Sequence, residues 1–375
     1  MAQLLIPHSV EERVRLRPAV VEMASPAPRD IWRGVLRDDP GATALQTPEY
    51  VDAVASATGG TDVSRFYQLR DGRQLVLPLV RGRSRSGLPL DEGYAGGYGH
   101  GGMLATGGLL AEDVRTVVQD LRERSVRLRI GGAHHTSEQW SAGVLPGVTE
   151  ERRCAEVIEL DQDYAGDIGA FRTAQFGPET GQKLSRAVRL GVEVEKDTGS
   201  RLIPVFYDIY RARVERVIPR SEPLSVPGRR AEPYEMFATV AAMTGEACRV
   251  FIAWYRGRPI AASILLVHGQ HATVWGSYSI RELAAPMTAK LLTHVTAIED
   301  AVSSGCRFID LGPSGDVELE HDKNSLGASP RSVVDLRIEP AGLARLRAVR
   351  ERAGGVLVRA LTRSPGSSTL GQPKP

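Results

Sequence analysis

The sequence is poor in cysteine, and its few cysteines are not arranged in pairs. Cys154, Cys248 and Cys306 are far apart, odd in number and form no CxxC motif. A disulfide framework or a cysteine-based zinc site is therefore not expected, and the usage is typical of a reducing cytosol. His134 and His135 have no carboxylate or cysteine at ligand spacing, so we predict no metal and no other cofactor.

Long apolar runs and a strong excess of one charge are also missing. No stretch approaches 18 consecutive apolar residues, which predicts no membrane span. The first thirty residues lack the apolar core of a signal peptide, so we expect a cytoplasmic protein. The net charge of +2 argues against a uniformly basic nucleic-acid binder, although it allows a local basic face.

What the sequence does contain is the composition of a globular protein with a substantial core. Hydrophobic residues make up 42% and charged residues 25% of 375 positions, enough for two domains. Periodicity in the first half predicts helices at 30–35, 48–57 and 111–124 and strands at 66–70, 74–80, 127–130 and 155–160. Asp71-Gly72 predicts a hairpin, and His134, His135 and Trp140 are placed in a loop.

The second half has a clearer pattern. It predicts helices at 168–175, 181–190, 202–217, 234–243 and 285–303, and strands at 192–195, 249–255, 259–267, 271–278, 308–311 and 332–338. A basic helix at 343–361 and a disordered tail follow. We therefore predict a first domain at 1–160, a second at 165–340, a C-terminal helix at 341–363 and a tail at 364–375.

Several motifs of the second half occur in the order of one known family. They are a basic helix running into a strand (182–194), the turn Arg256-Gly257-Arg258-Pro259, Trp275-Gly276-Ser277-Tyr278-Ser279, the stretch 305–312 and Lys323-Asn324-Ser325-Leu326-Gly327. This set resembles the Fem-like aminoacyltransferases and their relatives in the acetyltransferase (GNAT) superfamily. The segment 94–102 is similar to a Tyr-Gly-Gly stretch of the family's first domain. The family often has an aromatic residue before the lysine, where this chain has Asp322.

The resemblance implies an α+β fold of two tandem GNAT-like domains, each a mixed sheet flanked by helices, with the second domain the clearer. It also implies an acyltransferase that forms an amide bond with an amine acceptor, either a natural-product intermediate or a peptidoglycan precursor. A possibility from another functional class is a binding protein that retains the fold without catalysis.

One short stretch, residues 281–288, indicates which acyl donor the protein uses. Acyl-CoA users of the superfamily usually have a glycine-rich turn here, whose backbone N–H groups bind pyrophosphate. This chain has no glycine in the stretch, and Pro286 removes one N–H. The sequence therefore favours aminoacyl-tRNA as donor, with acyl-CoA as the alternative because divergent acyl-CoA users tolerate a poor turn. The glycine-rich run at 93–102 lacks nucleotide-loop spacing and predicts turns or close approach of a substrate.

Two residues are candidates for catalysis. The resemblance implies that Lys323 stabilises an oxyanion or binds the phosphate of the tRNA terminal adenosine, whereas the sequence by itself shows only a lysine in a loop between strands. Asp310 ends a strand and could accept a proton from the attacking amine, or cap the turn at Gly312-Pro313. No serine-nucleophile motif is present.

Other candidates concern binding. The predicted substrate-binding residues are Tyr278, Ser277, Asn324, His321 and Tyr98, and His321 could also act as a base. Cations recur every third residue on two predicted helices, at Lys183, Arg186 and Arg189 and at Arg213 and Arg216. Such rows are either solvated faces or contacts to phosphates of a tRNA acceptor stem or a phosphorylated acceptor.

Overall fold

The computed structural model describes residues 20–83, 89–93, 101–124, 127–164, 167–217, 232–313, 317–340 and 342. The first half contains the following helices and strands: β1 (Val20–Ala24), α2 (Arg29–Asp38), α3 (Pro48–Thr58), β2 (Thr61–Asp62), β3 (Arg65–Leu69), β4 (Gln74–Leu77), β5 (Val80–Arg83), β6 (Pro89–Glu92), β7 (Leu104–Ala105), α4 (Ala111–Arg124), β8 (Leu128–Gly131), α5 (Ser137–Ala142) and β9 (Thr149–Glu159).

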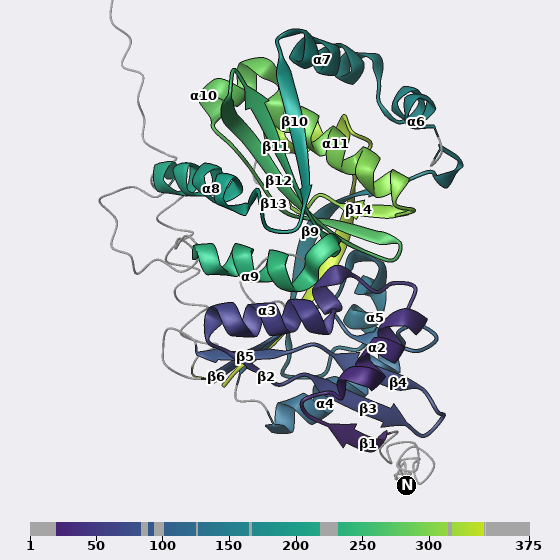
Figure 1. The fold of residues 1–375 in the computed structure, drawn as a ribbon. Coiled ribbons are helices and arrows are strands. Elements are labelled where there is room, and N and C mark those ends of the chain that lie inside the picture. The colour runs from purple at the N-terminus through teal and green to yellow at the C-terminus, as the bar shows by residue number, and fades with distance from the viewer. Residues whose placement is uncertain are drawn as a thin grey trace, which may run out of the picture.

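The second half is built from α6 (Ile168–Gln175), α7 (Pro178–Arg189), β10 (Val192–Thr198), α8 (Ile203–Val217), α9 (Tyr234–Thr244), β11 (Cys248–Tyr255), β12 (Arg258–His268), β13 (His271–Ser279), α10 (Arg281–Ala284), α11 (Ala289–Ser303), β14 (Phe308–Asp310), α12 (Val317–Asn324) and β15 (Ser329–Ile338). Helices flank the sheet in both halves (Figure 1). None of the helices described is both long and apolar enough to cross a membrane.

Most described elements match the sequence predictions to within a few residues, including the β3–β4 hairpin. Three local predictions are wrong. The segment after β8 is a 3-10 turn and helix α5 rather than a loop, Lys323 lies in the last turn of α12 rather than in a loop, and the strand at 74–80 is two strands, β4 and β5. The helix expected at 285–303 begins at Ala289, after α10 and a 3-10 turn. The predicted C-terminal helix, the tail and Tyr98 fall outside the described residues.

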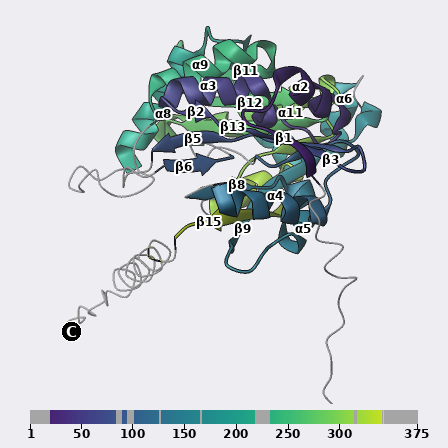
Figure 2. The same cartoon turned by 90° about the horizontal axis from the view of Figure 1, so that it is seen from below.

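Two sheets organise the molecule, and one of them spans both halves. A four-stranded sheet has the order β1-β3-β4-β7, and an eleven-stranded sheet has the order β10-β11-β12-β13-β14-β9-β15-β8-β6-β5-β2. Figure 2 shows β8, β15 and β9 lying together, with α4 and α5 beside them. The fold class predicted from the sequence, an α+β fold with a mixed sheet flanked by helices, is confirmed.

The strands on either side of the central β9–β15 pair follow the same pattern, which reveals two tandem units. In the first half the antiparallel pair β5–β6 leads through α4 to β8, which is parallel to β6. In the second half the antiparallel pair β12–β13 leads through α11 to β14, which is parallel to β13. Each helix supplies the crossover that a parallel strand pair requires. α4 and α11 therefore occupy equivalent places.

The last strand of each unit pairs with the other unit. After α5, β9 pairs with β14, whereas after α12, β15 pairs with β8. β9 and β15 also pair with each other from Ser329–Val157 to Arg337–Thr149. This exchange makes one continuous sheet, so residues of β9 lie beside the end of β14. The domain limits at 160 and 165 remain a prediction.

A shared core also joins the halves. α3 packs against α9, and one buried cluster contains Val51 and Val54 from α3 together with Phe237 and Val240 from α9 (Figure 1). Fully burying such a side chain stabilises the fold by about 1.5–3 kcal/mol. The two units therefore hold β13, β14 and α11 in a fixed arrangement, on which the candidate site is built.

Candidate functional site

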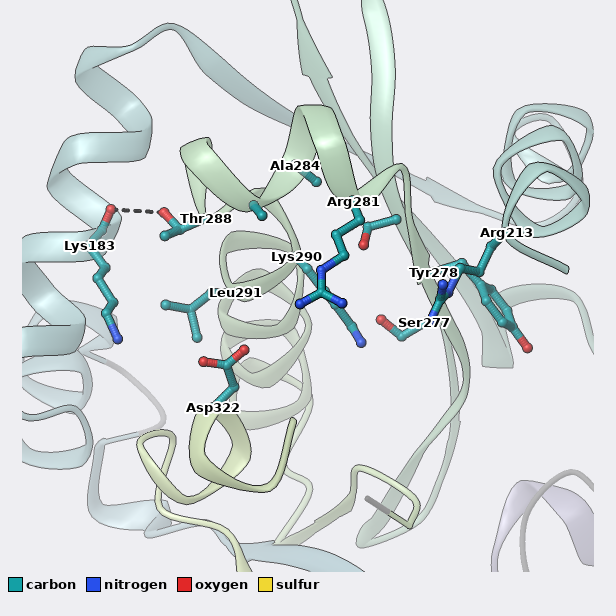
Figure 3. Close-up of a pocket in the computed structure, with 12 residues that line it drawn as sticks. Lys183, Arg213, Ser277, Tyr278, Arg281, Ala284, Thr288, Lys290, Leu291 and Asp322 are labelled. Carbon is teal, nitrogen blue, oxygen red and sulfur yellow. Dashed lines mark hydrogen bonds between the residues drawn. The ribbon is translucent and has the colours of Figure 1, made fainter. Parts of the chain in front are cut away.

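A cavity of about 320 Å³ lies in the second half, where β13 ends and α11 begins. Figure 3 shows Lys183 on one side of it, Arg281 and Lys290 in its middle, and Tyr278 with Arg213 on the other side. The described residues that line it are Lys183, Arg213, Ser277, Tyr278, Ser279, Arg281, Ala284, Ala285, Thr288, Lys290, Leu291 and Asp322.

The cavity is electropositive. Among its described lining residues, four carry a positive charge, and Asp322 carries the single negative charge. The first turn of α11 contributes Thr288, Lys290 and Leu291 to the wall and contains no acidic residue. A helix N-terminus has N–H groups without intrahelical acceptors and a partial positive charge. Cationic side chains and helix dipole together favour an anionic ligand, such as a phosphate or a carboxylate.

Contacts between helices hold the cavity wall. The Thr288 hydroxyl shares its proton between the Met287 and Lys183 carbonyl oxygens, at 2.7 and 3.2 Å, and the second contact links α7 to the start of α11 (Figure 3). The Lys183 ammonium forms an ion pair with Glu179 one turn earlier, at 2.9 Å. Further along, the Thr180 hydroxyl donates to the Ser325 carbonyl at 3.2 Å, so α7 also fixes the end of α12.

The segment between β13 and α11 uses its own backbone donors. The N–H groups of Leu283 and Ala284 donate to the Ile280 carbonyl at 3.0 and 2.9 Å, and the N–H of Thr288 donates to the Ala285 carbonyl at 3.2 Å. Pro286 has no N–H. Because these donors close α10 and the 3-10 turn, they do not form a cradle of backbone N–H groups. In the segment before α11, anion binding therefore falls to the side chains, and the unpaired backbone N–H groups lie in the first turn of α11.

Lys323 is buried, with an exposed fraction of 2%. Its ammonium donates hydrogen bonds to the carbonyl oxygens of Gly312 and Pro313, at 2.8 and 2.9 Å. Burial, followed by the charge of Lys290, lowers the pKa of Lys323 to about 8. Lys323 therefore fixes the turn after β14 from beneath, while Asp322 beside it lines the cavity. The Asp322 position is where the chain departs from the family pattern.

Asp310 lies at the end of β14 and is 7% exposed. Its Oδ1 accepts a hydrogen bond from the Gly312 N–H at 2.7 Å, the geometry of a turn cap. Gly312 has a φ of +71°, and its carbonyl is also bound by Glu156 N–H and by Lys323. Glu156 comes from β9 of the first half, and its Oε2 is buried without a hydrogen-bond partner in the part of the chain described. Asp310 lines a separate small cavity, with Thr43, His134 and His271, and not the cavity at the start of α11.

The structure brings together only part of the predicted set. Ser277, Tyr278, Lys183 and Arg213 line the cavity at the start of α11. Exposed candidates that are not among its described lining residues are Arg186, Arg189, His321 and Asn324. Arg216 lies in α8, and its side chain, like the whole of Tyr98, is outside the described part.

Sequence reasoning missed three residues at this site, namely Arg281, Lys290 and His294. Lys290 lines the cavity, and His294 lies one turn further along α11, behind Ser277. Lys290 and His294 could have been found from their spacing of four residues, which puts a cation and an imidazole on one face of the predicted helix. No group of three or more His, Cys, Asp or Glu side chains suited to a metal ion occurs within the described ranges.

Comparison with known proteins agrees with this geometry. Residues 179–322 match the family model of the acetyltransferase (GNAT) domain. The second half of the chain carries a GNAT domain. The match includes β13, α11 and the cavity between them. This match supports the acyltransferase activity that the sequence predicts.

The whole fold also has relatives among solved structures. FemX aligns with a TM-score of 0.58 at 11% identity, covering 84% of this chain and 97% of FemX. A conserved protein of unknown function from Bacteroides thetaiotaomicron VPI-5482 aligns with a TM-score of 0.54 at 9% identity, covering 84% of this chain and all of that one. The chain therefore has the fold of FemX, as the sequence resemblance implied. No curated protein has a sequence that matches this chain.

Proposed function

We propose that the protein is an aminoacyltransferase, which moves an aminoacyl group from aminoacyl-tRNA to an amine acceptor and forms an amide bond. The observation that carries the proposal is the combination of an electropositive cavity with a segment whose backbone donors are already used. Lys183, Arg213, Arg281 and Lys290 offer side-chain contacts to an anion, whereas Leu283, Ala284 and Thr288 have no N–H group left for a pyrophosphate.

A terminal nucleotide of tRNA suits such a cavity. Its phosphates are spread along a backbone and are bound in proteins mainly by Lys and Arg side chains. A pyrophosphate is instead bound most tightly by consecutive backbone N–H groups at a helix N-terminus. The acceptor amine must be neutral to attack, so the transfer rate should rise with pH until the amine is deprotonated.

In this proposal the residues have distinct roles. The cationic side chains bind donor phosphate, Tyr278 contacts the transferred group, and Ser277 contacts the acceptor amine. Lys323 and Asp310 hold the turn after β14, through the Gly312 and Pro313 carbonyls and the Gly312 N–H. Lys323 thereby acts on the site through the position of the turn rather than as a side chain that lines the cavity.

The experiment is transfer from charged tRNA to a panel of amines, with the product detected by mass spectrometry. We expect product that disappears when the charged tRNA is treated with RNase before the assay. A matched reaction contains acetyl-CoA in place of the tRNA. Product that is resistant to RNase and supported by acetyl-CoA contradicts the proposal.

A second candidate is an acyl-CoA-dependent N-acetyltransferase, favoured by the match of residues 179–322 to an acetyltransferase family model. It predicts saturable binding of acetyl-CoA in calorimetry at micromolar protein concentration. Lys290→Ala would weaken that binding, since the cavity at the start of α11 would then hold the pyrophosphate.

A further inference from the structure

A chain of hydroxyl groups connects the wall of the cavity to a buried imidazole. Ser277 lines the cavity and is partly exposed, whereas His294 behind it is 4% exposed. The distance from His294 Nε2 to Ser277 Oγ is 2.8 Å. Ser277 is on β13 and His294 is on α11, so this contact lies where the sheet and the central helix of the GNAT domain meet.

The direction of this hydrogen bond follows from the protons available. The Thr293 hydroxyl donates to the Lys290 carbonyl at 2.8 Å, and the Ser263 hydroxyl donates to Ser277 Oγ at 2.9 Å, a shorter contact than its 3.3 Å to Thr293. A serine hydroxyl has one proton. Because Ser277 accepts from Ser263, its own proton is free to point to His294 Nε2.

The state of His294 agrees with this direction. Burial, followed by the charges of Lys290 and Lys323, lowers the pKa of His294 to about 3. The imidazole is therefore neutral at pH 7 and can keep a lone pair on Nε2 for the Ser277 proton. An anionic donor bound beside Lys290 would offset that charge and make the imidazole more basic. A hydroxyl bonded to a neutral imidazole is the arrangement that carries protons in enzyme sites.

We propose that Ser277 and His294 form a proton relay, in which Ser277 takes a proton from the attacking amine and passes its own proton to His294 Nε2. The inference rests on the proposed function only in that an acyl group is transferred to an amine. The amine nitrogen forms a bond to the acyl carbon, and the bond from that carbon to the leaving oxygen or sulfur breaks. The proton on His294 then returns through Ser277 to the leaving atom, so that His294 ends neutral.

In this relay Ser277 is a catalytic residue because it touches the acceptor, and His294 acts through it. Ser263 is a positioning residue, since its proton occupies one lone pair of Ser277. Ser277 does not form a covalent acyl intermediate in this scheme, because the attacking group is the amine itself.

The kinetic test uses Ser277→Ala, His294→Gln and the double variant, assayed with whichever acyl donor the wild type accepts. Glutamine can keep a hydrogen bond to Ser277 but cannot take up a proton. General acid–base catalysis contributes about 10²–10⁴-fold, so kcat of each single variant should fall by that factor while the Kd of the donor is unchanged. Since the two residues act as a unit, the double variant should be no slower than the slower single variant.

The matched control is Thr296→Val, on the same helix. The Thr296 hydroxyl donates only to the Leu292 carbonyl among the described contacts, at 2.9 Å, so kcat should stay within about two-fold of wild type. Circular dichroism and thermal unfolding check that each variant is folded. If His294→Gln does not fold, His294→Ala with added imidazole replaces it, and imidazole should restore part of the rate.

Three results would overturn the relay: a loss of kcat smaller than about three-fold, single losses that multiply in the double variant, or an acyl group on Ser277 found by mass spectrometry with donor and no acceptor. Use of acetyl-CoA in place of charged tRNA would refute the proposed function and leave the relay testable.

A measurement independent of activity is ¹⁵N NMR of labelled histidine, which should show an unprotonated Nε2 on His294 whose resonance moves in Ser277→Ala. A protonated Nε2 at pH 7 would contradict the relay.

Discussion

The two equivalent helices α4 and α11 differ most at their N-termini. In α4 the first turn contains Asp113, whose carboxylate accepts a hydrogen bond from the Leu110 N–H at 2.8 Å and pairs with Arg73 at 2.7 Å. The positive end of this helix is thus neutralised by the chain itself. In α11 the first turn has no acidic residue, and it lines the cavity with Lys290. Two copies of one architecture therefore differ in that one contains its own anion and the other is open to bind one.

The turns that follow the parallel strands show the same contrast. After β8, the backbone at Gly132 is covered by the ring of Trp140, which is fully buried. After β14, the backbone at Gly312 is bound instead by the Lys323 ammonium and the Asp310 carboxylate. The first unit has an apolar core at this point, whereas the second has a polar one beside a cavity. We infer that the first unit supports the fold and the second performs the chemistry.

The largest expected effect is on stability, from Asp113→Ala in the first unit. The change removes the partner of a buried ion pair and the cap of α4, which should lower the free energy of unfolding by roughly 3–5 kcal/mol. Urea denaturation measures it. The matched control is Glu112→Ala, an exposed acid in the same turn, which should stay within about 0.5 kcal/mol of wild type. An Asp113→Ala protein as stable as wild type would contradict the comparison.

The contact between the units should make stability depend on pH. His271 is 5% exposed and stacks on Phe308 with ring centroids 5.2 Å apart, while the ring of His135 from the first unit is 4.9 Å away. Burial, followed by the charge of His135, lowers the pKa of His271 to about 4. The folded value lies below the unfolded one of about 6.5, so this stabilisation is complete above pH 6.5 and is lost as the pH falls towards 4.

His271→Gln should therefore flatten the decline in stability between pH 7 and 4, by up to about 3 kcal/mol. Urea denaturation at several pH values measures this dependence. The control is His321→Gln, whose ring is exposed and which should leave the slope unchanged. The same slope in His271→Gln as in wild type would show that protonation of His271 does not cause the loss of stability at low pH.

In the second unit, Lys290→Ala should change binding rather than folding. A hydrogen bond to a charged group contributes about 1.5–3 kcal/mol, so KM for the donor should rise roughly 10–100-fold. Steady-state kinetics at two salt concentrations measure it, and the loss should shrink at high salt. Arg115→Ala, which removes a cation from the equivalent helix α4, should leave KM unchanged. A similar loss from both variants would contradict the assignment of the anion site to one unit.

The smallest effects should come from one glycine in each of the two turns. A Cβ added at Gly132 would lie 2.2 Å from Trp140 Cδ1, so Gly132→Ala should cost about 1–3 kcal/mol through overpacking. At Gly312 no heavy atom of the described residues lies within 4 Å of such a Cβ, and the φ of +71° is unfavourable for alanine, which costs about 1 kcal/mol. Urea denaturation compares the free energies of unfolding of the two variants. A larger loss for Gly312→Ala would contradict the tighter packing around Gly132.

Much of the fold could be predicted from the sequence because periodicity and turn signals are local. α6 was predicted at its observed limits, and the alternation and Asp71-Gly72 signal predicted the β3–β4 hairpin. α5 was missed because its six residues follow two histidines and show no helical period, although Trp140 anchors them in the core. Lys323 was assigned to a loop because α12 is short and mostly polar, so that its periodicity is weak.

For the site, the sequence predicted Ser277, Tyr278, Lys183 and Arg213 and the absence of a glycine turn before α11. It could not predict that β9 of the first half would pair with β14, because strand pairing depends on contacts far apart in the chain. That pairing places Glu156 beside Gly312, and tertiary packing buries Lys323 beneath the same turn. The Ser277–His294 contact likewise exists only once α11 lies against β13.

The sequence by itself determined the types of the main elements and the chemistry available near α11, since both depend on residue identity and short spacing. The tertiary structure decided which of those residues meet. Long-range pairing and burial set the distances and the pKa values, and they left one helix N-terminus closed by Asp113 and its equivalent open to the cavity.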